Sequence, residues 1–315
     1  MQREPDDSTL QSGLSGTSLP KCEQIAPRYR AIFVEAYGGL RSDSGMIDGV
    51  PKALAKLQQR GIQSFLITND ASRSPEAMRD YYRHPELGEL FAIDRIVSSG
   101  MLAGEFLAAK VAGKGELKSA SARNSVQNDA RPVVAFLGKP GSAYYIELAG
   151  LRAVPVAEVE DLAAVRALVL LDDEGFDWQR DLNTALNLLR RANIPAIVAN
   201  TDASYPVKSG EVALAVGSLA RMMESVVGKS FIRFGKPDTQ MFSFAYQRAL
   251  RDIPNLRKTE ILMVGDTLHT DILGANQFGI DTALVLSGNT QREKARLQIR
   301  TSGIIPDYIF DSIVS

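Results

Sequence analysis

Five polar side chains in this sequence are of types that could act together on a phosphate group. Glu35 and Asp266 each follow a short apolar run and offer carboxylate oxygens, the kind of ligand that Mg²⁺ prefers. Lys236 can place an ammonium group against a phosphate, while Thr68 and Asn69 offer hydroxyl and amide donors to its oxygens. Phosphoryl transfer requires cations that neutralise the phosphate oxygens, donors that hold them and a nucleophile in line. These residue types therefore indicate Mg²⁺-assisted chemistry on a phosphate ester.

A parallel α/β sheet is the arrangement that would bring these side chains together. From Arg30 onward, short apolar or β-branched runs alternate with stretches of helical periodicity, which is typical of such a sheet. The predicted strands are residues 31–34, 64–68, 93–97, 231–234, 261–264 and 282–286. Ligands bind at the carboxyl ends of strands in open parallel sheets. We therefore expect the polar residues at these strand ends to converge on one crevice, although they are far apart in the sequence.

A second α/β run lies between these strands and indicates an inserted domain. Residues 113–131 are rich in Gly, Ser and Lys, the composition of a surface connection. The run that follows has predicted strands at residues 133–137, 167–171 and 196–199, and predicted helices at residues 144–148 and 178–192. The length of 315 residues also favours two domains, or one domain with a large insertion.

The composition and charge exclude several classes of partner. Of all residues, 45% are hydrophobic and 23% charged, as in an ordinary globular protein. Lys and Arg number 36 against 37 Asp and Glu, so no global field attracts nucleic acid or an anionic membrane surface. No apolar run reaches the ~18 residues of a membrane-spanning helix. We therefore expect neither a nucleic acid nor a membrane as partner.

The N-terminal residues 1–28 are predicted to form a flexible tail. They are rich in Asp, Ser, Gly and Gln and lack the basic-then-apolar order of a secretion signal. Cys22, the only cysteine, lies among them, so no intrachain disulfide can form. A reducing cytoplasm is the predicted location.

Three of the polar segments resemble signature motifs of the haloacid dehalogenase superfamily, most closely its type IIA branch, which includes pyridoxal phosphate phosphatases. Leu66–Asn69 resembles motif II, Phe234–Pro237 resembles motif III and Val264–Ile272 resembles motif IV, and the resemblance runs from about residue 30 to 290. The Gly-Lys-Pro triplet of motif III also occurs at residues 138–140. That copy falls inside the inserted run, so Lys139 is predicted to be a surface lysine.

The resemblance implies an α/β fold with a Rossmann-like parallel-sheet core and an inserted α/β cap domain of type C2. The predicted boundaries are residues 29–110 for the first part of the core, 111–202 for the cap and 203–315 for the second part of the core. A cap of this kind covers the crevice, excludes water and selects the leaving group. The implied partner is a small phosphorylated metabolite, the implied cofactor is Mg²⁺, and formation of a homodimer is left open.

The resemblance also implies a role for each residue of the site. The family's motif I has an aspartate that attacks phosphorus and, two positions later, an aspartate that serves as general acid and base. The residues implied to be catalytic are Glu35, Tyr37 and Lys236. The residues implied to bind substrate are Gly38, Thr68, Asn69 and Lys236. The residues implied to bind Mg²⁺ are Glu35, Tyr37 through its backbone carbonyl, Asp266 and Asp271.

The sequence departs from the family at the two motif I positions. Glu35 has one methylene more than aspartate, and the ~1 Å shift of its carboxylate can cost about 10²-fold in rate. Tyr37 carries a phenol with a reference pKa of ~10, which is poorly suited to exchange protons near neutrality.

Three functions are compatible with these observations: an enzyme, a binding protein and a structural protein. One is a Mg²⁺-dependent phosphatase of small phosphate esters, and the alternative is a catalytically inactive protein that binds a phosphorylated ligand for regulation. A structural scaffold with a vestigial pocket would need neither the ion nor the phosphate.

Overall fold

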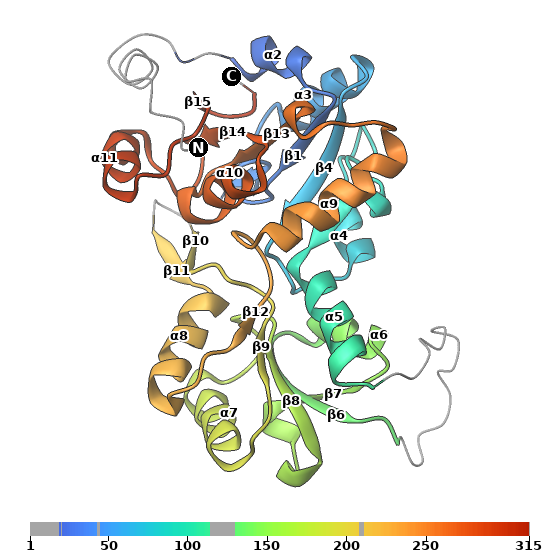
Figure 1. Cartoon of the computed structure of the whole chain (residues 1–315), viewed down its shortest axis with the longest axis vertical. Coiled ribbons are helices and arrows are strands. Elements are labelled where there is room, and N and C mark those ends of the chain that lie inside the picture. The colour runs from blue at the N-terminus through green and yellow to red at the C-terminus, as the bar shows by residue number, and fades with distance from the viewer. Residues whose placement is uncertain (1–18, 20, 43–44, 114–129, 208–210, 315) are drawn as a thin grey trace.

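The computed structural model describes residues 19, 21–42, 45–113, 130–207 and 211–314, which form two α/β units stacked along the long axis (Figure 1). The first unit contains a six-stranded parallel sheet with strand order β15-β14-β13-β1-β4-β5. Its strands are β1 (Ala31–Val34), β4 (Gln63–Thr68), β5 (Ile96–Ser98), β13 (Ile261–Gly265), β14 (Asp281–Val285) and β15 (Tyr308–Phe310). The predicted α/β fold with a parallel sheet is confirmed.

The second unit contains a five-stranded sheet with strand order β12-β9-β8-β6-β7, in which every pairing is also parallel. Its strands are β6 (Val133–Leu137), β7 (Arg152–Pro155), β8 (Val165–Leu170), β9 (Ala196–Val198) and β12 (Ile232–Arg233). Two short antiparallel pairs complete the strands: β2 (Arg41–Ser42) with β3 (Gly45–Met46), and β10 (Ser204–Pro206) with β11 (Val212–Leu214).

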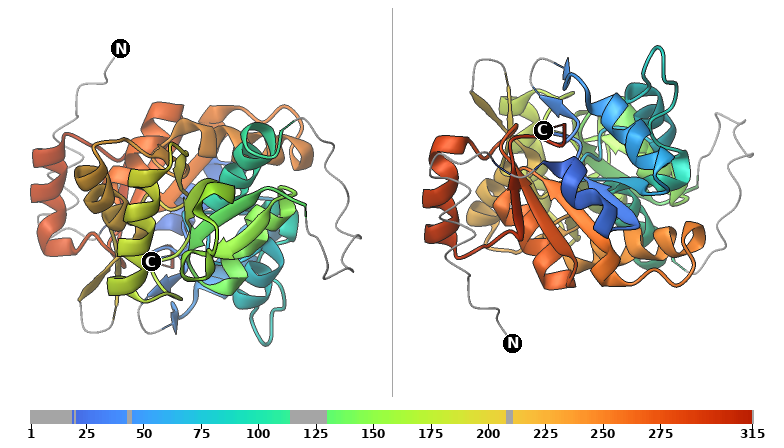
Figure 2. Two further views of the ribbon diagram at one scale, coloured as in Figure 1. Left: turned by 90° about the horizontal axis from the view of Figure 1, so that it is seen from below. Right: turned by 90° about the horizontal axis from the view of Figure 1, so that it is seen from above.

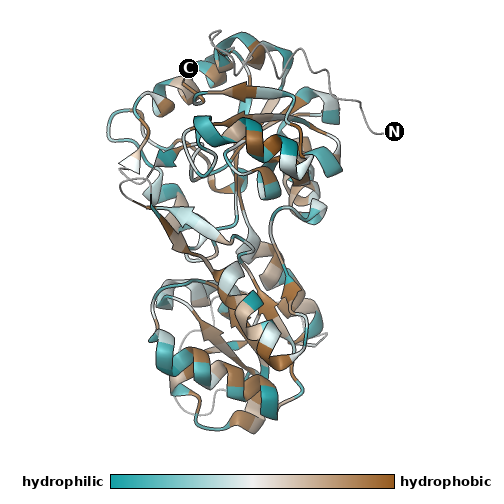
Figure 3. Ribbon diagram, turned by 90° about the vertical axis from the view of Figure 1, so that its left-hand side faces the viewer, coloured by the Kyte–Doolittle hydropathy of each residue, from teal (hydrophilic) through white to brown (hydrophobic). Residues whose placement is uncertain are grey.

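Helices cover the faces of both sheets (Figure 2). Those of the first unit are α2 (Cys22–Ile25), α3 (Val50–Gln59), α4 (Pro75–Tyr81), α5 (Ser99–Lys110), α9 (Thr239–Asp252), α10 (Leu273–Phe278) and α11 (Arg292–Ser302). Those of the second unit are α6 (Tyr144–Leu148), α7 (Trp178–Arg191) and α8 (Val216–Val227). Apolar residues gather on the strands, whereas the outer surfaces of the helices are largely polar (Figure 3).

The central strand β1 is apolar along its whole length because it is buried on both faces. Successive side chains of a strand point to opposite faces of the sheet. Ala31 and Phe33 accordingly belong to the apolar cluster that contains α9, and Ile32 and Val34 belong to the cluster that contains α3 and α4. This sandwich fixes the carboxyl end of β1, where the chain continues into Glu35.

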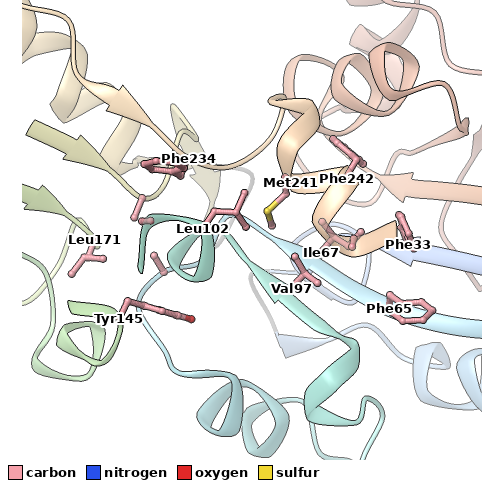
Figure 4. Close-up of a cluster of buried hydrophobic side chains, with 14 of the residues drawn as sticks. Phe33, Phe65, Ile67, Val97, Leu102, Tyr145, Leu171, Phe234, Met241 and Phe242 are labelled. Atoms are coloured by element: carbon pink, nitrogen blue, oxygen red, sulfur yellow. The ribbon is translucent and has the colours of Figure 1, made fainter. Parts of the chain in front are cut away.

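A continuous apolar cluster joins the two units. Figure 4 shows it running from Phe33 and Phe65 in the first sheet to Leu171 and Phe234 beside the second. Tyr145 on α6 anchors the joint, because its hydroxyl bonds to the Ser98 hydroxyl at 2.7 Å and donates to the Arg73 carbonyl at 2.6 Å. The cleft between the units therefore has a packed wall on one side.

The second sheet includes a strand that lies later in the sequence than the predicted end of the inserted domain. The run 231–234 was expected in the sheet of the first unit, but β12 pairs with β9 in the second sheet, so that expectation is wrong. Helix α8 packs on the same sheet through Val216, Leu219 and Met223. We therefore propose that the inserted unit ends near residue 234 instead of at residue 202.

Residues 1–28 were predicted to form a flexible tail, and this prediction is wrong for residues 21–28. Cys22–Ile25 form α2 and residues 26–28 form a 3₁₀ turn. Cys22 and Ala26 are buried against the first unit because their side chains are small and apolar. Residues 1–18 and 20 lie outside the described part of the chain. Among the residues described, no helix is both long and apolar enough to cross a membrane.

Candidate active site

A cavity of about 890 Å³ lies between the two units, a size within the range of small-molecule sites. Strand ends of both sheets contribute to its walls. From the first unit it receives Glu35 and Tyr37 after β1, Thr68 and Asp70 at β4, Asp266 and Asp271 after β13, and Asn289 after β14. From the strand ends of the second sheet it receives Lys139 after β6, Asp172 and Asp173 after β8, Thr201 and Asp202 after β9, and Lys236 after β12.

Lys236 lies at the centre of the charged groups and is only 1% exposed. Its ammonium donates to Asp271 Oδ1 at 2.6 Å and to the Ile67 carbonyl at 3.1 Å, and it also forms an ion pair with Glu35. Thr68 donates its hydroxyl to the other Glu35 oxygen, Oε1, at 3.0 Å. The Glu35 carboxylate is thus held between an ammonium group and a hydroxyl group.

Asp266 is buried at the end of β13 and lies against backbone that has no side chains. A Cβ at Gly38 or at Gly288 would come within 2.5 Å of its carboxylate, so both positions require glycine. The backbone N–H of Asn289 and the Thr267 hydroxyl donate to this carboxylate. Burial, reinforced by the nearby Asp271 charge, raises the pKa of Asp266 to about 7, and the donated hydrogen bonds and Lys236 offset this in part.

Tyr37 packs its ring against the second unit, with its centroid 6.4 Å from that of Tyr205. Burial raises the pKa of its phenol to about 12, and the neighbouring Tyr81 and Asp70 contribute in the same direction. Arg73 and Arg41 act against this rise. The phenol therefore keeps its proton throughout the neutral range and is a weaker acid than free tyrosine.

Asn69 of the first unit is hydrogen-bonded to two segments that follow strands of the second sheet, one after β9 and one after β12. Its side-chain oxygen accepts from the Lys236 N–H at 2.8 Å. Its amide nitrogen donates to Asp202 Oδ1 at 2.9 Å, to Thr201 Oγ1 at 3.0 Å and to the Lys236 carbonyl at 3.2 Å. Gly235 must be glycine here, since a Cβ would lie 2.5 Å from the Asn69 oxygen. These contacts hold the backbone of Lys236 in place.

The metal-free protein should become less stable as the pH rises from about 4 to 7, because Asp202 at this joint then loses a proton. Burial raises the pKa of Asp202 from 3.8 to about 7, with Asp271 and Asp70 adding to the rise and Asn69 opposing it. A folded-state pKa above the unfolded one stabilises the fold at low pH, and this stabilisation is lost as the pH rises. We expect Asp202→Asn to weaken this dependence and to stabilise the protein at pH 8 by a few kcal/mol at most, since one pKa unit corresponds to about 1.4 kcal/mol.

Urea unfolding at pH 4, 6 and 8 in the presence of a chelator measures this effect. Asp161→Asn is the matched control, because Asp161 is exposed in the second unit and should leave the profile unchanged. A profile of Asp202→Asn that runs parallel to that of the wild type would contradict the expectation.

The cavity brings together most of the residues predicted from the sequence. Its walls include Glu35, Tyr37, Thr68, Lys236, Asp266 and Asp271. Gly38 and Asn69 are not part of the lining: Gly38 lies against the Asp266 carboxylate, and Asn69 is bonded to the segments that follow β9 and β12. Lys139 was predicted to be a surface lysine, and its side chain is indeed 40% exposed; it also lines the cavity, where it is paired with Glu174.

The oxygen groups at the carboxyl ends of β1 and β13 suit Mg²⁺. The described residues contain no group of three or more His, Cys, Asp or Glu side chains placed to hold a metal ion by themselves. Two carboxylates, Glu35 and Asp266, together with the Tyr37 carbonyl would give a set of hard oxygen donors, with water completing the shell. A divalent cation would also stabilise the ionised form of Asp266, whose pKa is raised by burial and by the nearby Asp271 charge. The residues therefore fit the ion.

Comparison with known proteins identifies the family. The family model for haloacid dehalogenase-like hydrolases matches residues 32–152, and a second model, described as HAD-hydrolase-like, matches residues 233–315. A crystal structure from Cytophaga hutchinsonii, described as a possible sugar phosphatase of the HAD superfamily, is 45% identical to this chain. It covers 95% of this chain and 99% of its own, with a TM-score of 0.83. The chain belongs to the haloacid dehalogenase superfamily.

More distant relatives agree with this assignment and with the type IIA branch. Chronophin from Rattus norvegicus is 27% identical over 302 residues, which are 95% of this chain and 90% of the relative. Glycerol phosphate phosphatase from Mycobacterium tuberculosis, solved in complex with magnesium, shares the fold at 24% identity and a TM-score of 0.68. The alignment covers 92% of this chain and 77% of that chain. The predicted Rossmann-like core with a cap is the fold of this superfamily.

Proposed function

We propose that this protein hydrolyses a small phosphate monoester with the help of Mg²⁺. The observation that carries the proposal is the meeting of Glu35, Lys236 and Asp266 at one cavity, from three different strand ends. Relatives named as phosphatases of small phosphate esters support it. A cavity of about 890 Å³ has room for a phosphate and a leaving group of metabolite size.

The proposed reaction begins with attack by the Glu35 carboxylate on phosphorus. A bond forms between a carboxylate oxygen and phosphorus while the bond to the leaving oxygen breaks, and the departing alkoxide takes a proton from solvent. Water then hydrolyses the resulting acyl phosphate, which releases phosphate and restores the carboxylate. The Thr68 hydroxyl and the Lys236 ammonium, which contact Glu35, would hold the phosphoryl oxygens beside it. The proposed ligands of Mg²⁺ are Glu35, the Tyr37 carbonyl and Asp266, with Asp271 in support. The bound ion would neutralise phosphate charge.

Two of the original assignments are refined in this proposal. Gly38 has no side chain and so would leave room for the Asp266 carboxylate. Asn69 would act as a positioning residue for Lys236. Neither residue lines the cavity, so their predicted roles as direct phosphate ligands are not part of this proposal.

The test of this function is phosphate release from a panel of small phosphate monoesters with and without Mg²⁺. We expect release that a chelator abolishes and that falls at least ~10²-fold in Glu35→Gln and in Asp266→Asn, because each variant removes a charged group at the reacting centre. Asp161→Asn, an exposed change of the same kind, should keep the wild-type rate. Release that is equal in wild type and Glu35→Gln would rule out the proposed nucleophile.

The second candidate function is binding of a phosphorylated ligand without turnover, and the raised pKa of Tyr37 favours it. In that case Mg²⁺ and a phosphate ester together would raise the melting temperature, since a ligand of the native state stabilises it. The same ester would be recovered intact. A steady release of phosphate from it would decide for the enzyme.

The location and assembly of the protein stay predictions. We propose a cytoplasmic protein, with a homodimer as the assembly to be tested. Light scattering coupled to size-exclusion chromatography would establish the number of subunits.

A further inference from the structure

The half of the cavity that belongs to the second unit contains a polar cluster outside the phosphoryl site. Its members follow β6 and β8, whose carboxyl ends face the same space as those of the first sheet. They are Lys139, Asp172, Asp173 and Glu174, with Tyr205 beside them.

Asp172 has an acceptor that the protein does not use. The residue is 8% exposed, and its Oδ1 accepts from the Glu174 N–H at 3.3 Å. Its Oδ2 is buried and, among the described residues, receives no hydrogen bond, while the Lys139 ammonium lies 3.8 Å away. A buried carboxylate oxygen without a donor costs free energy, so a donor from a ligand in the cavity would stabilise it.

The neighbours of Asp172 are fixed in place. Asp173 Oδ2 accepts from the Tyr205 hydroxyl at 2.9 Å, and the Asp173 carbonyl accepts from the Trp178 indole at 2.9 Å. The two loops that carry the cluster touch through backbone, since a Cβ at Gly175 would lie 2.7 Å from the Lys139 Cα. A cluster held in this way can select a ligand by geometry.

The charge of this wall is negative. Lys139 is shared between Glu174 at 2.5 Å and Asp172 at 3.8 Å, so one positive charge in the cluster faces the three carboxylates of Asp172, Asp173 and Glu174. Of the arginines that line the cavity, Arg73 pairs with Asp70 and Arg233 with Glu224, while Arg221 lies on α8 and is exposed. Burial raises the pKa of Asp172 to about 6, so the carboxylate is still ionised near pH 7.5. A second anionic group on the substrate would be repelled here.

We propose that Asp172 is a specificity-determining residue that accepts a hydrogen bond from a hydroxyl of a neutral, polyhydroxylated leaving group and disfavours leaving groups that carry a carboxylate. The ligand class is the phosphate monoester of a sugar or sugar alcohol. This inference rests on the proposed phosphatase function and extends it to the second wall of the cavity. A hydroxyl group can donate to Asp172 and accept from Lys139, whereas a carboxylate can only accept.

Two hexose-derived phosphates test the inference, because they differ only at the end remote from phosphate. Glucitol 6-phosphate ends in a hydroxymethyl group and 6-phosphogluconate ends in a carboxylate. We expect the Mg²⁺-loaded wild type to have a kcat/KM at least ~10-fold higher for glucitol 6-phosphate. Asp172→Asn should lower kcat/KM for glucitol 6-phosphate roughly 10- to 100-fold, as expected for loss of a hydrogen bond to a charged acceptor, and should reduce the preference to within about threefold.

Two controls separate specificity from folding and from chemistry. p-Nitrophenyl phosphate has no hydroxyl to bind, so its hydrolysis should change less than about threefold in Asp172→Asn. Asp161→Asn, on the exposed surface of the same unit, should retain the full preference. A wild type without preference, or a preference that Asp172→Asn leaves intact, would overturn the assignment.

Calorimetric titration of the Mg²⁺-loaded protein with the same two phosphates gives an answer even without turnover. If p-nitrophenyl phosphate is not hydrolysed, the proposed function fails, but a lower Kd for glucitol 6-phosphate that Asp172→Asn removes still supports the subsite. Equal Kd values, or no binding of either phosphate, would overturn it.

Discussion

Replacing Tyr37 by aspartate should raise the turnover of an alkyl phosphate ester by about 10²- to 10⁴-fold, the range that general acid–base catalysis contributes. The phenol of Tyr37 has its pKa raised to about 12, and Tyr37 lines the cavity that would hold the leaving group of the proposed reaction. An alkoxide is strongly basic, so its departure needs a proton that this phenol gives up with difficulty. Arg73 and Arg41, which already favour negative charge at Tyr37, would help to keep the new carboxyl group ionised for the later attack by water.

The choice of substrate distinguishes proton donation from other effects of Tyr37→Asp. The gain should be large for glucitol 6-phosphate and smaller for p-nitrophenyl phosphate, because nitrophenolate leaves without protonation. We would measure kcat for both esters between pH 5 and 8 in Tyr37→Asp and in Tyr37→Asn. The asparagine variant has nearly the same shape but cannot exchange a proton, so it should show no gain.

Tyr37→Phe tests whether the phenol already acts. This variant keeps the ring that packs against Tyr205 and removes only the hydroxyl. We expect its rate to stay within about threefold of the wild type. A loss of 10²-fold or more in Tyr37→Phe would identify the phenol as the working acid and would contradict the reason given for the gain in Tyr37→Asp.

The sequence predicted the first wall of the cavity because one rule applies to every strand of a parallel sheet. Short apolar runs locate β1, β4 and β13, and the polar residues at their carboxyl ends share one edge of the sheet. Glu35, Thr68 and Asp266 were found in this way.

Apart from Lys236, the residues of the opposite wall were missed, because the strand-end rule was applied only to the first run of strands. The second run was recognised as α/β, but its strand ends were not treated as part of a site. Lys139 follows β6, Asp172 follows β8 and Asp202 follows β9 within four residues. The missing information was that the two sheets direct their carboxyl ends at one space, which depends on how the units pack.

Other features depend on contacts that no local pattern encodes. The run 231–234 has the apolar character of any buried strand, and only its pairing with β9 assigns it to the second sheet. Asn69 has a donor and an acceptor suited to phosphate, but these groups bond to segments more than 130 residues away. Sequence patterns give the kind of element, and packing decides its partner.

Lys236→Met should lower the free energy of unfolding at pH 8 by roughly 3–5 kcal/mol, the cost of removing one partner from a buried ion pair. The Lys236 ammonium contacts Glu35 and Asp271, and all three side chains are buried. Methionine fills much of the same volume but leaves the two carboxylates without their cation. We also expect phosphate release to fall at least 10²- to 10³-fold, because the donor that would hold the phosphoryl group is lost.

The pH dependence of the stability lost in Lys236→Met tests whether unpaired buried carboxylates are its cause. Without the ammonium group, Glu35 and Asp271 would be two buried carboxylates with no cation beside them. Protonation would then relieve the repulsion, so the stability difference between wild type and Lys236→Met should shrink as the pH falls from 8 to 5. Urea unfolding at these pH values in the absence of Mg²⁺ measures it.

The second Gly-Lys-Pro triplet supplies the matched control. Lys139→Met makes the same change at a lysine whose side chain is 40% exposed and paired at the surface of the cavity, where an ion pair contributes about 0–1 kcal/mol. It should leave the fold nearly as stable as the wild type and change KM more than kcat.

Adding Asp271→Asn to Lys236→Met should recover part of the lost stability, because it removes the charge of one of the two carboxylates left without a cation. The double variant should remain inactive. Equal stability of Lys236→Met and Lys139→Met would mean that burial of charge does not govern this site. Recovery of stability without activity would show that Lys236 has two roles. It compensates the charge of the buried carboxylates, and it binds the phosphoryl group, a role that removal of a carboxylate charge cannot restore.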